Sequence, residues 1–314
     1  MSLLSFLSLR LKVWFVRLMF HSTELFRALL GISEHSKSPP QRSFSIRSTT
    51  SARRIRIRVY EPEYFDKNKH YPVHLNFHGS GFFISMFGTD GDFCQLVSRR
   101  TGAIVLDCDY AKGPEYPFPA APNDVQDIIS YVIANKDEYF DTSRITIGGF
   151  SAGGTLALTA GVSQPKDTLK GIVLFYPCVD LSLDNAIRAP PPVSEGNTNP
   201  IPPWFNEVVS RSYTPHGTDM SDPRLSPINT PLTTLPEHIL FVVCEEDPLR
   251  HDAVEYAKQL KKEGIKVVLK EVPKVVHAWD KRARKGTPAW AAKHDSYEAA
   301  IEMLKLVYGT QSDN

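Results

Sequence analysis

A serine stands between two glycines where a strand-like segment passes into a helical one. Residues Gly149–Gly153 read Gly-Phe-Ser-Ala-Gly and fit the pattern G-x-S-x-G, with an apolar segment before them and a helical segment after them. In so tight a turn the residues two before and two after the serine must be small, and the hydroxyl projects beside a helix N-terminus that favours negative charge. This context favours Ser151 as a nucleophile; the alternative is a glycine-rich turn that serves packing only.

A serine nucleophile needs a general base, and the histidines after Ser151 are the candidates. His277 comes in a loop just past a predicted strand, from which a mobile imidazole can reach the edge of the sheet. His238 precedes its strand and would lie at the opposite end, while His294 falls on a helix face, where a solvated histidine is expected. We therefore predict His277 as the base. The five candidates are His216, His238, His251, His277 and His294.

The acid that orients this base should follow the preceding strand. Residues Cys244–Arg250 read Cys-Glu-Glu-Asp-Pro-Leu-Arg and do follow one. Asp247 is the preferred candidate, because Asp-Pro starts a turn and directs the carboxylate off the strand end. Glu245 and Glu246 are near alternatives. Asp180 is a remote one, whose ordinary role is a hydrogen bond within a loop or cap.

A third group of small residues precedes the serine motif. His78-Gly79-Ser80-Gly81 follows a strand, and small residues here let backbone N–H groups approach the oxygen of a substrate. Each such donor contributes about 2.7–4 kcal/mol to acyl transfer. The alternative is an ordinary glycine turn, but the position ahead of Ser151 favours an oxyanion site.

The elements that must position these residues alternate between strand and helix. Segment 53–60 places Ile and Val between arginines, which is typical of a strand with one wet face. Strands alternating with helices predict the α/β class, with a mostly parallel central sheet flanked by helices on both faces. The predicted strands are 53–60, 72–77, 103–106, 144–147, 171–175, 238–243 and 265–272, and the predicted helices are 123–133, 155–162, 252–262 and 289–307.

The first 31 residues are rich in Leu and Phe but contain no membrane span. Four basic residues interrupt them: Arg10, Lys12, Arg17 and Arg27. No uncharged run reaches the roughly 18 apolar residues that a span needs. The charges follow Leu9 rather than precede the apolar stretch, which disfavours a signal peptide. We expect a pair of amphipathic helices that pack on the main body; a membrane-surface helix or anchor and a cleaved signal are the alternatives.

Two parts of the chain interrupt the alternation. Segment 36–42 is rich in Ser and Pro and is typical of a linker, so we expect N-terminal cap helices and linker over 1–45 and a catalytic domain over 46–314. Residues 189–203 carry runs of proline and lead into a helical segment at Trp204. An insertion at about 180–225 must therefore leave the sheet and return. We expect it to form, with the N-terminal helices, a helical cap over the strand ends.

The composition of the chain indicates which partners, metal sites and cellular locations are not expected. In 314 residues, 36 Lys+Arg against 35 Asp+Glu give a net charge of +1, which makes nucleic acid or an anionic membrane a poor partner. The four cysteines are widely spaced and form no C-x-x-C pair, so a zinc site or a disulfide framework is not expected and a reducing, cytoplasmic location is favoured. No motif for a metal or an organic cofactor is present.

Five motifs together resemble the hormone-sensitive-lipase-like family of α/β-hydrolase esterases: His78–Phe82, Pro117–Ala121, Gly149–Gly154, Tyr176-Pro177 and Asp247–Leu249. The resemblance runs from about Arg54 to the C-terminus. Segments 76–82 and 277–281 are most similar to the fungal esterases of this family. Some of those act in secondary metabolism, the versiconal acetate esterase type among them.

The resemblance implies a site and a mechanism. Ser151, Asp247 and His277 would form the triad, and the backbone N–H groups of Ser80, Gly81 and Ala152 would form the oxyanion hole. His78 would hold the loop without handling protons. The chain departs from the family where Ser80 replaces the third residue of HGGG, which adds a hydroxyl beside the acyl site. It departs again where Ala and Trp follow His277 and where His251 replaces a common acidic residue. These changes bear on the substrate rather than on the chemistry.

The predicted function is hydrolysis of short-acyl, acetyl-like esters of small molecules through an acyl-enzyme. Phe82 and Phe83, just after the oxyanion loop, are the better pair of candidates for an acyl pocket that favours a short chain. Alternatives are an acyltransferase, lyase or cyclisation catalyst with the same triad, and a catalytically silent small-molecule receptor. The aromatic candidates for the pocket lining are Phe82, Phe83, Phe87, Trp204, Phe205 and Trp279.

Overall fold

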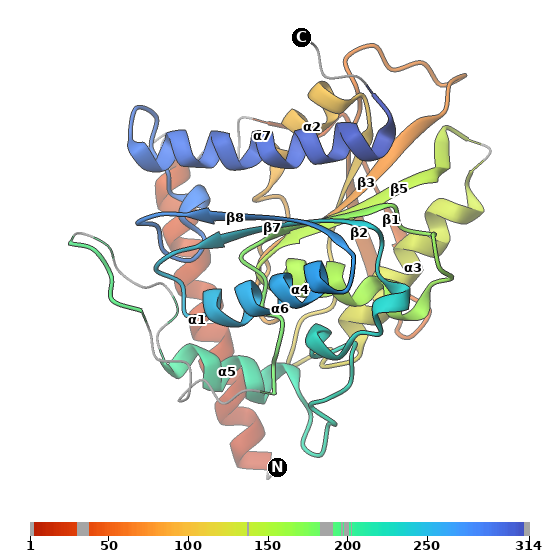
Figure 1. The fold of residues 1–314 in the computed structure, drawn as a ribbon. Coiled ribbons are helices and arrows are strands. Elements are labelled where there is room, and N and C mark those ends of the chain that lie inside the picture. The colour runs from red at the N-terminus through yellow and green to blue at the C-terminus, as the bar shows by residue number, and fades with distance from the viewer. Residues whose placement is uncertain are drawn as a thin grey trace.

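The computed structural model describes residues 3–29, 38–136, 138–182, 191–195, 197, 201 and 203–310. These residues form an eight-stranded sheet in the order β1-β2-β4-β3-β5-β6-β7-β8 (Figure 1). β1 and β2 run antiparallel to their neighbours, and the six strands from β4 to β8 are parallel. The strands are β1 (Arg42–Arg47), β2 (Arg54–Tyr60), β3 (Tyr71–Phe77), β4 (Ile104–Cys108), β5 (Phe140–Phe150), β6 (Gly171–Phe175), β7 (His238–Cys244) and β8 (Lys266–Val272).

Helices cover both faces of the sheet, because its central strands are apolar on both sides. α2 (Gly91–Thr101) and α7 (Pro288–Tyr308) lie on one face, where Phe93 and Tyr297 enter the core. α3 (Ala120–Ala134), α4 (Ala152–Thr159) and α6 (Arg250–Lys262) lie on the other (Figure 1). The predicted α/β class, with a mostly parallel sheet between helices, is confirmed.

A cap of two packed helices lies beside these layers. α1 (Leu3–Leu29) crosses α5 (Pro203–Tyr213) at the lower part of Figure 1. Leu9 and Val13 of α1 pack against Val208 of α5. Arg17 ties α1 to the main body, because its guanidinium donates to the carbonyl of Phe83 (2.7 Å) and to that of Gly113 (2.8 Å).

The N-terminal part of the molecule differs from the sequence-based expectation. One helix of 27 residues stands where a pair of helices was predicted. None of the helices in the described part of the chain has both the length and the apolarity needed to cross a bilayer. β1 lies across the predicted boundary at residue 46, because Phe44 and Ile46 pair with Ile57 and Ile55 at the edge of the sheet. The predicted linker is thus partly a strand.

Two further elements extend beyond their predicted ranges or were not predicted. β5 begins at Phe140, four residues before the predicted segment 144–147. α2 was missed, because its polar positions obscure the buried stripe of Phe93, Cys94 and Val97. Of the predicted insertion at 180–225, residues 183–190, 196, 198–200 and 202 lie outside the described residues.

Candidate active site

Ser151 lies in the turn between β5 and α4, in a backbone conformation that few side chains adopt. Its φ is 52° and its ψ is −119°, the kind of strained turn that G-x-S-x-G motifs use. A Cβ atom at Gly149 would stand 2.5 Å from the Phe77 carbonyl oxygen, and one at Gly153 would stand 1.9 Å from it. The two glycines therefore let β3 pass directly beside the turn that presents Ser151.

Three side chains from separate strand ends meet in one hydrogen-bonded line. Nε2 of His277 lies 2.9 Å from Oγ of Ser151, and Nδ1 lies 2.6 Å from Oδ2 of Asp247. Since an ionised carboxylate only accepts, the imidazole of His277 donates from Nδ1 and turns the lone pair of Nε2 to the serine hydroxyl. His277 is 8% exposed and Asp247 2% exposed, so water reaches this line mainly from the side of the serine.

The topology of the sheet explains how these residues meet. Ser151 follows β5, Asp247 follows β7 and His277 follows β8, and all three strands are parallel. Their carboxyl ends therefore open on the same edge of the sheet. The backbone N–H of Leu249 donates to the second oxygen of Asp247 (2.9 Å) and fixes the carboxylate that faces His277.

The alternative acids and bases are engaged elsewhere. Glu245 accepts from the backbone N–H of Lys274 (2.8 Å), and Glu246 accepts from that of Ser194 (3.0 Å). Asp180 accepts from the N–H two residues further along the chain (2.7 Å), as expected of a loop carboxylate. The remaining histidine candidates are exposed or lie at the far end of β7: His216, His238, His251 and His294.

A buried polar group behind His277 was not found from the sequence. The ring of Tyr176 packs edge-on against the imidazole, with centroids 4.7 Å apart, and its hydroxyl donates to Asp280 (2.6 Å). The ammonium of Lys281 lies 2.9 Å from the same carboxylate. Burial alone would raise the pKa of Asp280, but Lys281 and the Tyr176 hydroxyl hold it below its usual range. Asp280 is thus a charged acceptor that fixes the tyrosine against His277.

The loop predicted to form the oxyanion site, His78–Gly81, presents free backbone donors beside Ser151. Within the described part of the chain, the N–H groups of Ser80, Gly81 and Ala152 have no hydrogen-bond acceptor. Gly81 has a φ of 52°, and a Cβ atom there would stand 2.6 Å from the Phe205 ring. Only glycine therefore fits between the loop and α5. Ala152 is the first residue of α4, whose N-terminal N–H groups point toward the same place.

The hydroxyl of Ser80 turns away from the cavity. Its Oγ lies 2.6 Å from Oη of Tyr110 and accepts from the backbone N–H of Phe82 (2.8 Å). The hydroxyl of Tyr110 donates to the carbonyl of His78 (2.7 Å), so the proton between Ser80 and Tyr110 comes from the serine. The expectation of a hydroxyl beside the acyl site is therefore wrong. The serine instead ties the oxyanion loop to the residues that follow β4.

His78 packs inside this loop, away from Ser151. Its ring stacks on Tyr110, with centroids 4.8 Å apart. It also shares the Asp109 carboxylate with Lys112, whose ammonium lies 3.2 Å from it. Burial lowers the pKa of His78, and burial also lowers that of Lys112, to about 7. Burial and the nearby Lys112 charge outweigh Asp109 and favour a neutral imidazole that supports the loop, in keeping with the structural role that the resemblance implies.

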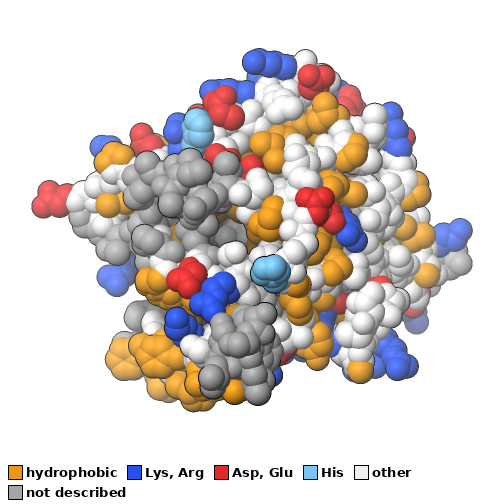
Figure 2. Space-filling view, turned by 90° about the horizontal axis from the view of Figure 1, so that it is seen from below, with side chains coloured by type: hydrophobic (Ala, Val, Ile, Leu, Met, Phe, Trp, Pro, Cys, Tyr) orange, Lys and Arg blue, Asp and Glu red, His pale blue; other side chains and the backbone are white. Residues whose placement is uncertain are grey.

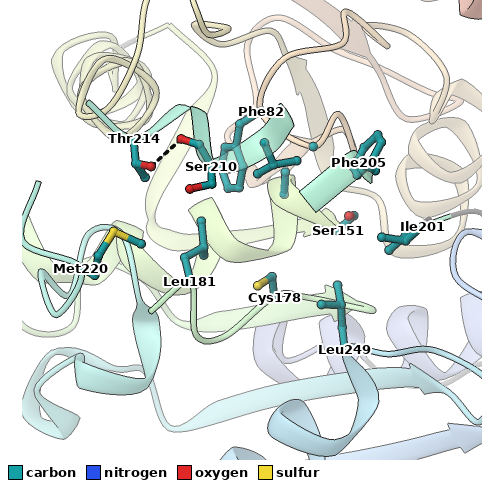
Figure 3. A pocket seen from close by; sticks show the side chains of 13 residues that line it. Phe82, Ser151, Cys178, Leu181, Ile201, Phe205, Ser210, Thr214, Met220 and Leu249 are labelled. Carbon is teal, nitrogen blue, oxygen red and sulfur yellow. Dashed lines mark hydrogen bonds between the residues drawn. The ribbon is translucent and has the colours of Figure 1, made fainter. Parts of the chain in front are cut away.

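An apolar cavity opens over Ser151, between the strand ends and α5. The space between its walls, including the part open to solvent, is about 620 Å³. Figure 3 shows apolar side chains to either side of Ser151, with Phe82 and Phe205 above it. In the described part of the chain, no three His, Cys, Asp or Glu side chains gather as metal ligands would. Most of the apolar lining lies outside the oxyanion loop: Leu181, Ile201, Val209, Met220 and Leu249.

The predicted aromatic lining is only partly at the cavity. Phe82 and Phe205 line it, and Phe82 is held by stacking on Tyr213 with centroids 3.9 Å apart. Phe83 is buried between α1 and α5, and Trp204 is half exposed on the outside of α5. The two other candidates also lie away from the cavity: Trp279 packs against Tyr176 in the core, and Phe87 lies between Arg56 and Arg58.

Several aromatic residues were wrongly predicted to line the cavity, because residue type does not show which way a side chain points. The spacing of residues along α5 would have been a better guide to the lining. Phe205 and Val209 are one turn apart and face the cavity, whereas Val208 faces α1. Leu181 and Met220 lie outside any regular element, where no periodicity marks them as lining.

Comparison with known proteins agrees with this architecture. The family model described as alpha/beta hydrolase fold matches residues 74–281. Carboxylesterase NlhH from Mycobacterium tuberculosis is 32% identical over 241 residues, which cover 72% of this chain and 71% of that protein. Versiconal hemiacetal acetate esterase from Dothistroma septosporum is 28% identical over 222 residues, 66% of each chain. Lipase 2 from a Moraxella strain is 32% identical over 222 residues, and this chain spans about half of its length (51%).

A solved structure matches nearly the whole molecule. The hyperthermophilic esterase from the archaeon Pyrobaculum calidifontis superposes with a TM-score of 0.79 at 26% identity, over 94% of this chain and 91% of that one. The family model covers well over half of the chain and includes both the loop at residues 78–81 and the turn that presents Ser151. The chain therefore belongs to the α/β-hydrolase fold family, among the carboxylesterase-type enzymes that the hormone-sensitive-lipase-like resemblance predicts.

Proposed function

We propose that the protein hydrolyses short-acyl esters of small molecules with Ser151 as nucleophile, His277 as general base and Asp247 as its orienting acid. The observation that carries the proposal is the hydrogen-bonded line from Asp247 through His277 to Ser151, with links of 2.6 and 2.9 Å. A serine in reach of an imidazole that a buried carboxylate orients is the arrangement that activates a hydroxyl for acyl transfer.

In the proposed first half-reaction, His277 takes the proton of Ser151 as the serine oxygen attacks the ester carbonyl. The N–H groups of Ser80, Gly81 and Ala152 stabilise the negative charge on the former carbonyl oxygen. Asp247 keeps the proton on Nδ1 and favours the imidazolium. His277 then passes the proton to the leaving alcohol, and Ser151 remains acylated.

In the proposed second half-reaction, water repeats these steps on the acyl-enzyme. His277 takes a proton from the water as its oxygen attacks the acyl carbon, and the oxyanion donors hold the second tetrahedral intermediate. The proton then returns to the oxygen of Ser151, and the acid is released. A nucleophile other than water would give acyl transfer, so the products distinguish hydrolysis from transfer.

The shape of the cavity supports a small substrate with a short acyl group. Phe82 stands on Tyr213 beside the oxyanion loop, and Leu181 and Met220 close the apolar lining further from Ser151. The ring of Phe82 would limit the length of an acyl group that is placed beside the oxyanion donors. The names of the relatives, a carboxylesterase and an acetate esterase among them, support the same substrate class.

The test is hydrolysis of p-nitrophenyl acetate, butyrate, octanoate and palmitate by the purified chain, beside Ser151→Ala. We expect activity on the two short esters that is lost in Ser151→Ala, with octanoate and palmitate slower. Turnover that persists in Ser151→Ala would refute the nucleophile. A folded wild-type chain that cleaves none of the esters but transfers the acetyl group to an added alcohol would replace hydrolysis with acyl transfer.

The preference for a short acyl group is tested by removing a side chain from the wall of the cavity, which enlarges the acyl site. Phe82→Ala should shift the optimum of kcat/KM to longer acyl groups, because it removes a ring that lines the cavity. Phe87→Ala is the matched control, since that ring packs beside Arg56 and Arg58 away from the cavity. An unchanged optimum in Phe82→Ala would remove Phe82 from the acyl site.

A further inference from the structure

The two sides of α1 have very different surroundings. On the inner side, Leu9 and Val13 are each 1% exposed and pack against Phe83 and Val208. Arg17 fastens the helix to two backbone carbonyls of the main body and to Glu115. α1 is therefore a fixed part of the folded molecule, and its outer side has a defined direction.

The outer side of α1 is a largely apolar surface, which Ser8 and Ser22 interrupt. Its large side chains recur at steps of three, four or seven residues, the spacing that puts them on one helix face. In the described part of the chain nothing covers them, and their exposed fractions run from 45% to 77%. Figure 2, seen from below, shows hydrophobic side chains gathered at the lower left, on the side of the molecule where α1 lies in Figure 1. This outer face consists of Leu7, Leu11, Trp14, Phe15, Leu18, Met19, Leu25, Phe26 and Leu29.

The outer face continues onto the cap. A groove between α1 and α5 is lined by Phe15 and Val16 from one helix and by Trp204 from the other, and Trp204 is itself 52% exposed. On its opposite side, α5 contributes Phe205 to the cavity over Ser151. A single helix thus separates the apolar outer surface from the candidate active site.

The charges on α1 indicate the kind of surface to which the outer face would bind. The helix carries four basic residues and one acidic residue in sequence, although the whole chain has a net charge of only +1. Two of these basic residues flank the apolar stripe: Lys12 lines the groove beside Phe15, and Arg10 is half exposed on the other flank, 3.9 Å from Glu115. Arg17 is turned to the main body, where it pairs with the same carboxylate. Cations that flank Trp, Phe and Leu on one helix are the pattern of segments that lie in the headgroup region of an anionic bilayer. Two copies of this face would instead bring like charges together.

We infer that α1 docks the protein on an anionic phospholipid surface, with the outer face in the headgroup and acyl boundary and the helix parallel to the membrane. Docking would set α5 and the cavity close to the bilayer, where apolar esters partition. The inference rests on α1 and its charges, not on the proposed function, because binding can be measured without turnover.

The experiment is co-sedimentation of the full chain with vesicles of phosphatidylcholine alone or with phosphatidylserine added. We expect binding to the anionic vesicles that weakens when salt is raised from about 0.05 M to about 0.5 M, because screening removes the electrostatic part. Leu11→Glu with Leu18→Glu should lower the affinity about tenfold or more, since a buried anion opposes both insertion and the lipid charge. Leu306→Glu is the matched control: Leu306 is 66% exposed on α7, close to the 68% of Leu11, and its substitution should leave binding unchanged.

Three results would overturn the inference. The wild-type chain could remain in the supernatant with anionic vesicles. The double variant, shown by circular dichroism to be folded, could bind as the wild type does. Light scattering could show a dimer that the double variant loses while neither protein binds vesicles, which would assign the face to a second copy. Hydrolysis of a water-soluble ester by the double variant is measured in parallel, so that loss of membrane binding and failure of the proposed function are seen separately.

Discussion

At the scale of single residues, the carboxylate behind the histidine is the most sensitive part of the site. Asp247→Asn keeps the shape of the side chain but presents an amide that can donate to Nδ1, which favours the wrong tautomer of His277. We expect kcat to fall roughly 10³- to 10⁴-fold while KM changes little. Steady-state kinetics on p-nitrophenyl acetate measures this.

The neighbouring carboxylate provides the control for that measurement. Glu245 bonds to the backbone N–H of Lys274 and does not reach His277, so Glu245→Gln should retain activity near that of the wild type. If Asp247→Asn stays within tenfold of the wild type, the proposed role of Asp247 is wrong.

Ser80 and Tyr110 are predicted to act together as positioning residues. Ser80→Ala leaves the backbone N–H of Phe82 without its acceptor, and Tyr110→Phe removes the bridge between Ser80 and His78. Each change should lower kcat about tenfold, the worth of one hydrogen bond, because the oxyanion donors lose their alignment. The double variant should be little worse than either single variant, since both act on one contact. Additive losses, or a rise in KM alone, would contradict this coupling.

Single residues of the site differ in whether their roles could be predicted from the sequence. Ser151, His277 and Asp247 could be named because local turn chemistry and chain order mark them. The roles of Tyr176 and Asp280 could not be predicted, although Tyr176 stands in one of the motifs, because Tyr176 meets His277 and Asp280 only across about one hundred residues of sequence. The direction of the Ser80 hydroxyl was likewise decided by a partner, Tyr110, that lies thirty residues away.

At the scale of elements, the packing of α1 on α5 holds the cap in place. Leu9→Ala removes a buried side chain from this contact and should lower the free energy of unfolding by about 2–5 kcal/mol if the site does not collapse. Leu11→Ala, on the exposed side of the same helix, should change it by less than about 0.5 kcal/mol. Denaturant unfolding of both variants, together with proteolysis of α1, measures the difference. Equal effects of the two substitutions would mean that α1 is not packed as described.

Strands that are buried on both faces could be located from their apolar runs, and so could the edge strand β8, whereas the edge strand β1 could not. β1 alternates Phe44 and Ile46 with Ser and Arg, and only its pairing with β2 shows that it is a strand. A pair of amphipathic helices was expected in the first 31 residues, whereas the structure has one helix, Leu3–Leu29. Its position is fixed by tertiary contacts that the sequence does not reveal, such as those of Arg17 with the carbonyls of Phe83 and Gly113.

At the scale of the whole molecule, buried carboxyl groups make stability depend on pH. Asp107 at the end of β4 is fully buried; burial, together with the neighbouring Asp90, raises its pKa to about 7. In the unfolded chain the pKa of such a group is about 3.9, so the folded state holds a proton that the unfolded state has released. This contribution to stability is present below about pH 4 and is lost as the pH rises through 7.

Asp107→Asn isolates this contribution, because the amide does not titrate. The variant should gain in Tm relative to the wild type as the pH is raised from 5 to 8. Thermal unfolding of both proteins over that range measures the difference. A difference in Tm that stays constant with pH would show that Asp107 is ionised in the folded protein.

The net charge of the chain does not show how the charges are distributed over its surface. A net charge of +1 argued against an anionic partner, yet α1 gathers basic residues and a broad apolar face on one side of the molecule. Only the fold shows that the inner apolar side chains of this helix are used for packing and that the outer ones are not.

The most direct test of the central claim is to label the purified chain with a fluorophosphonate and to locate the adduct by peptide mass spectrometry. A fluorophosphonate reacts with an activated serine and stays attached. We expect one adduct, on the peptide that contains Ser151, formed in proportion to the loss of esterase activity. We also expect no adduct in Ser151→Ala and far slower labelling in His277→Ala. Full activity after labelling, or labelling of Ser151→Ala at the wild-type rate, would show that Ser151 is not the nucleophile.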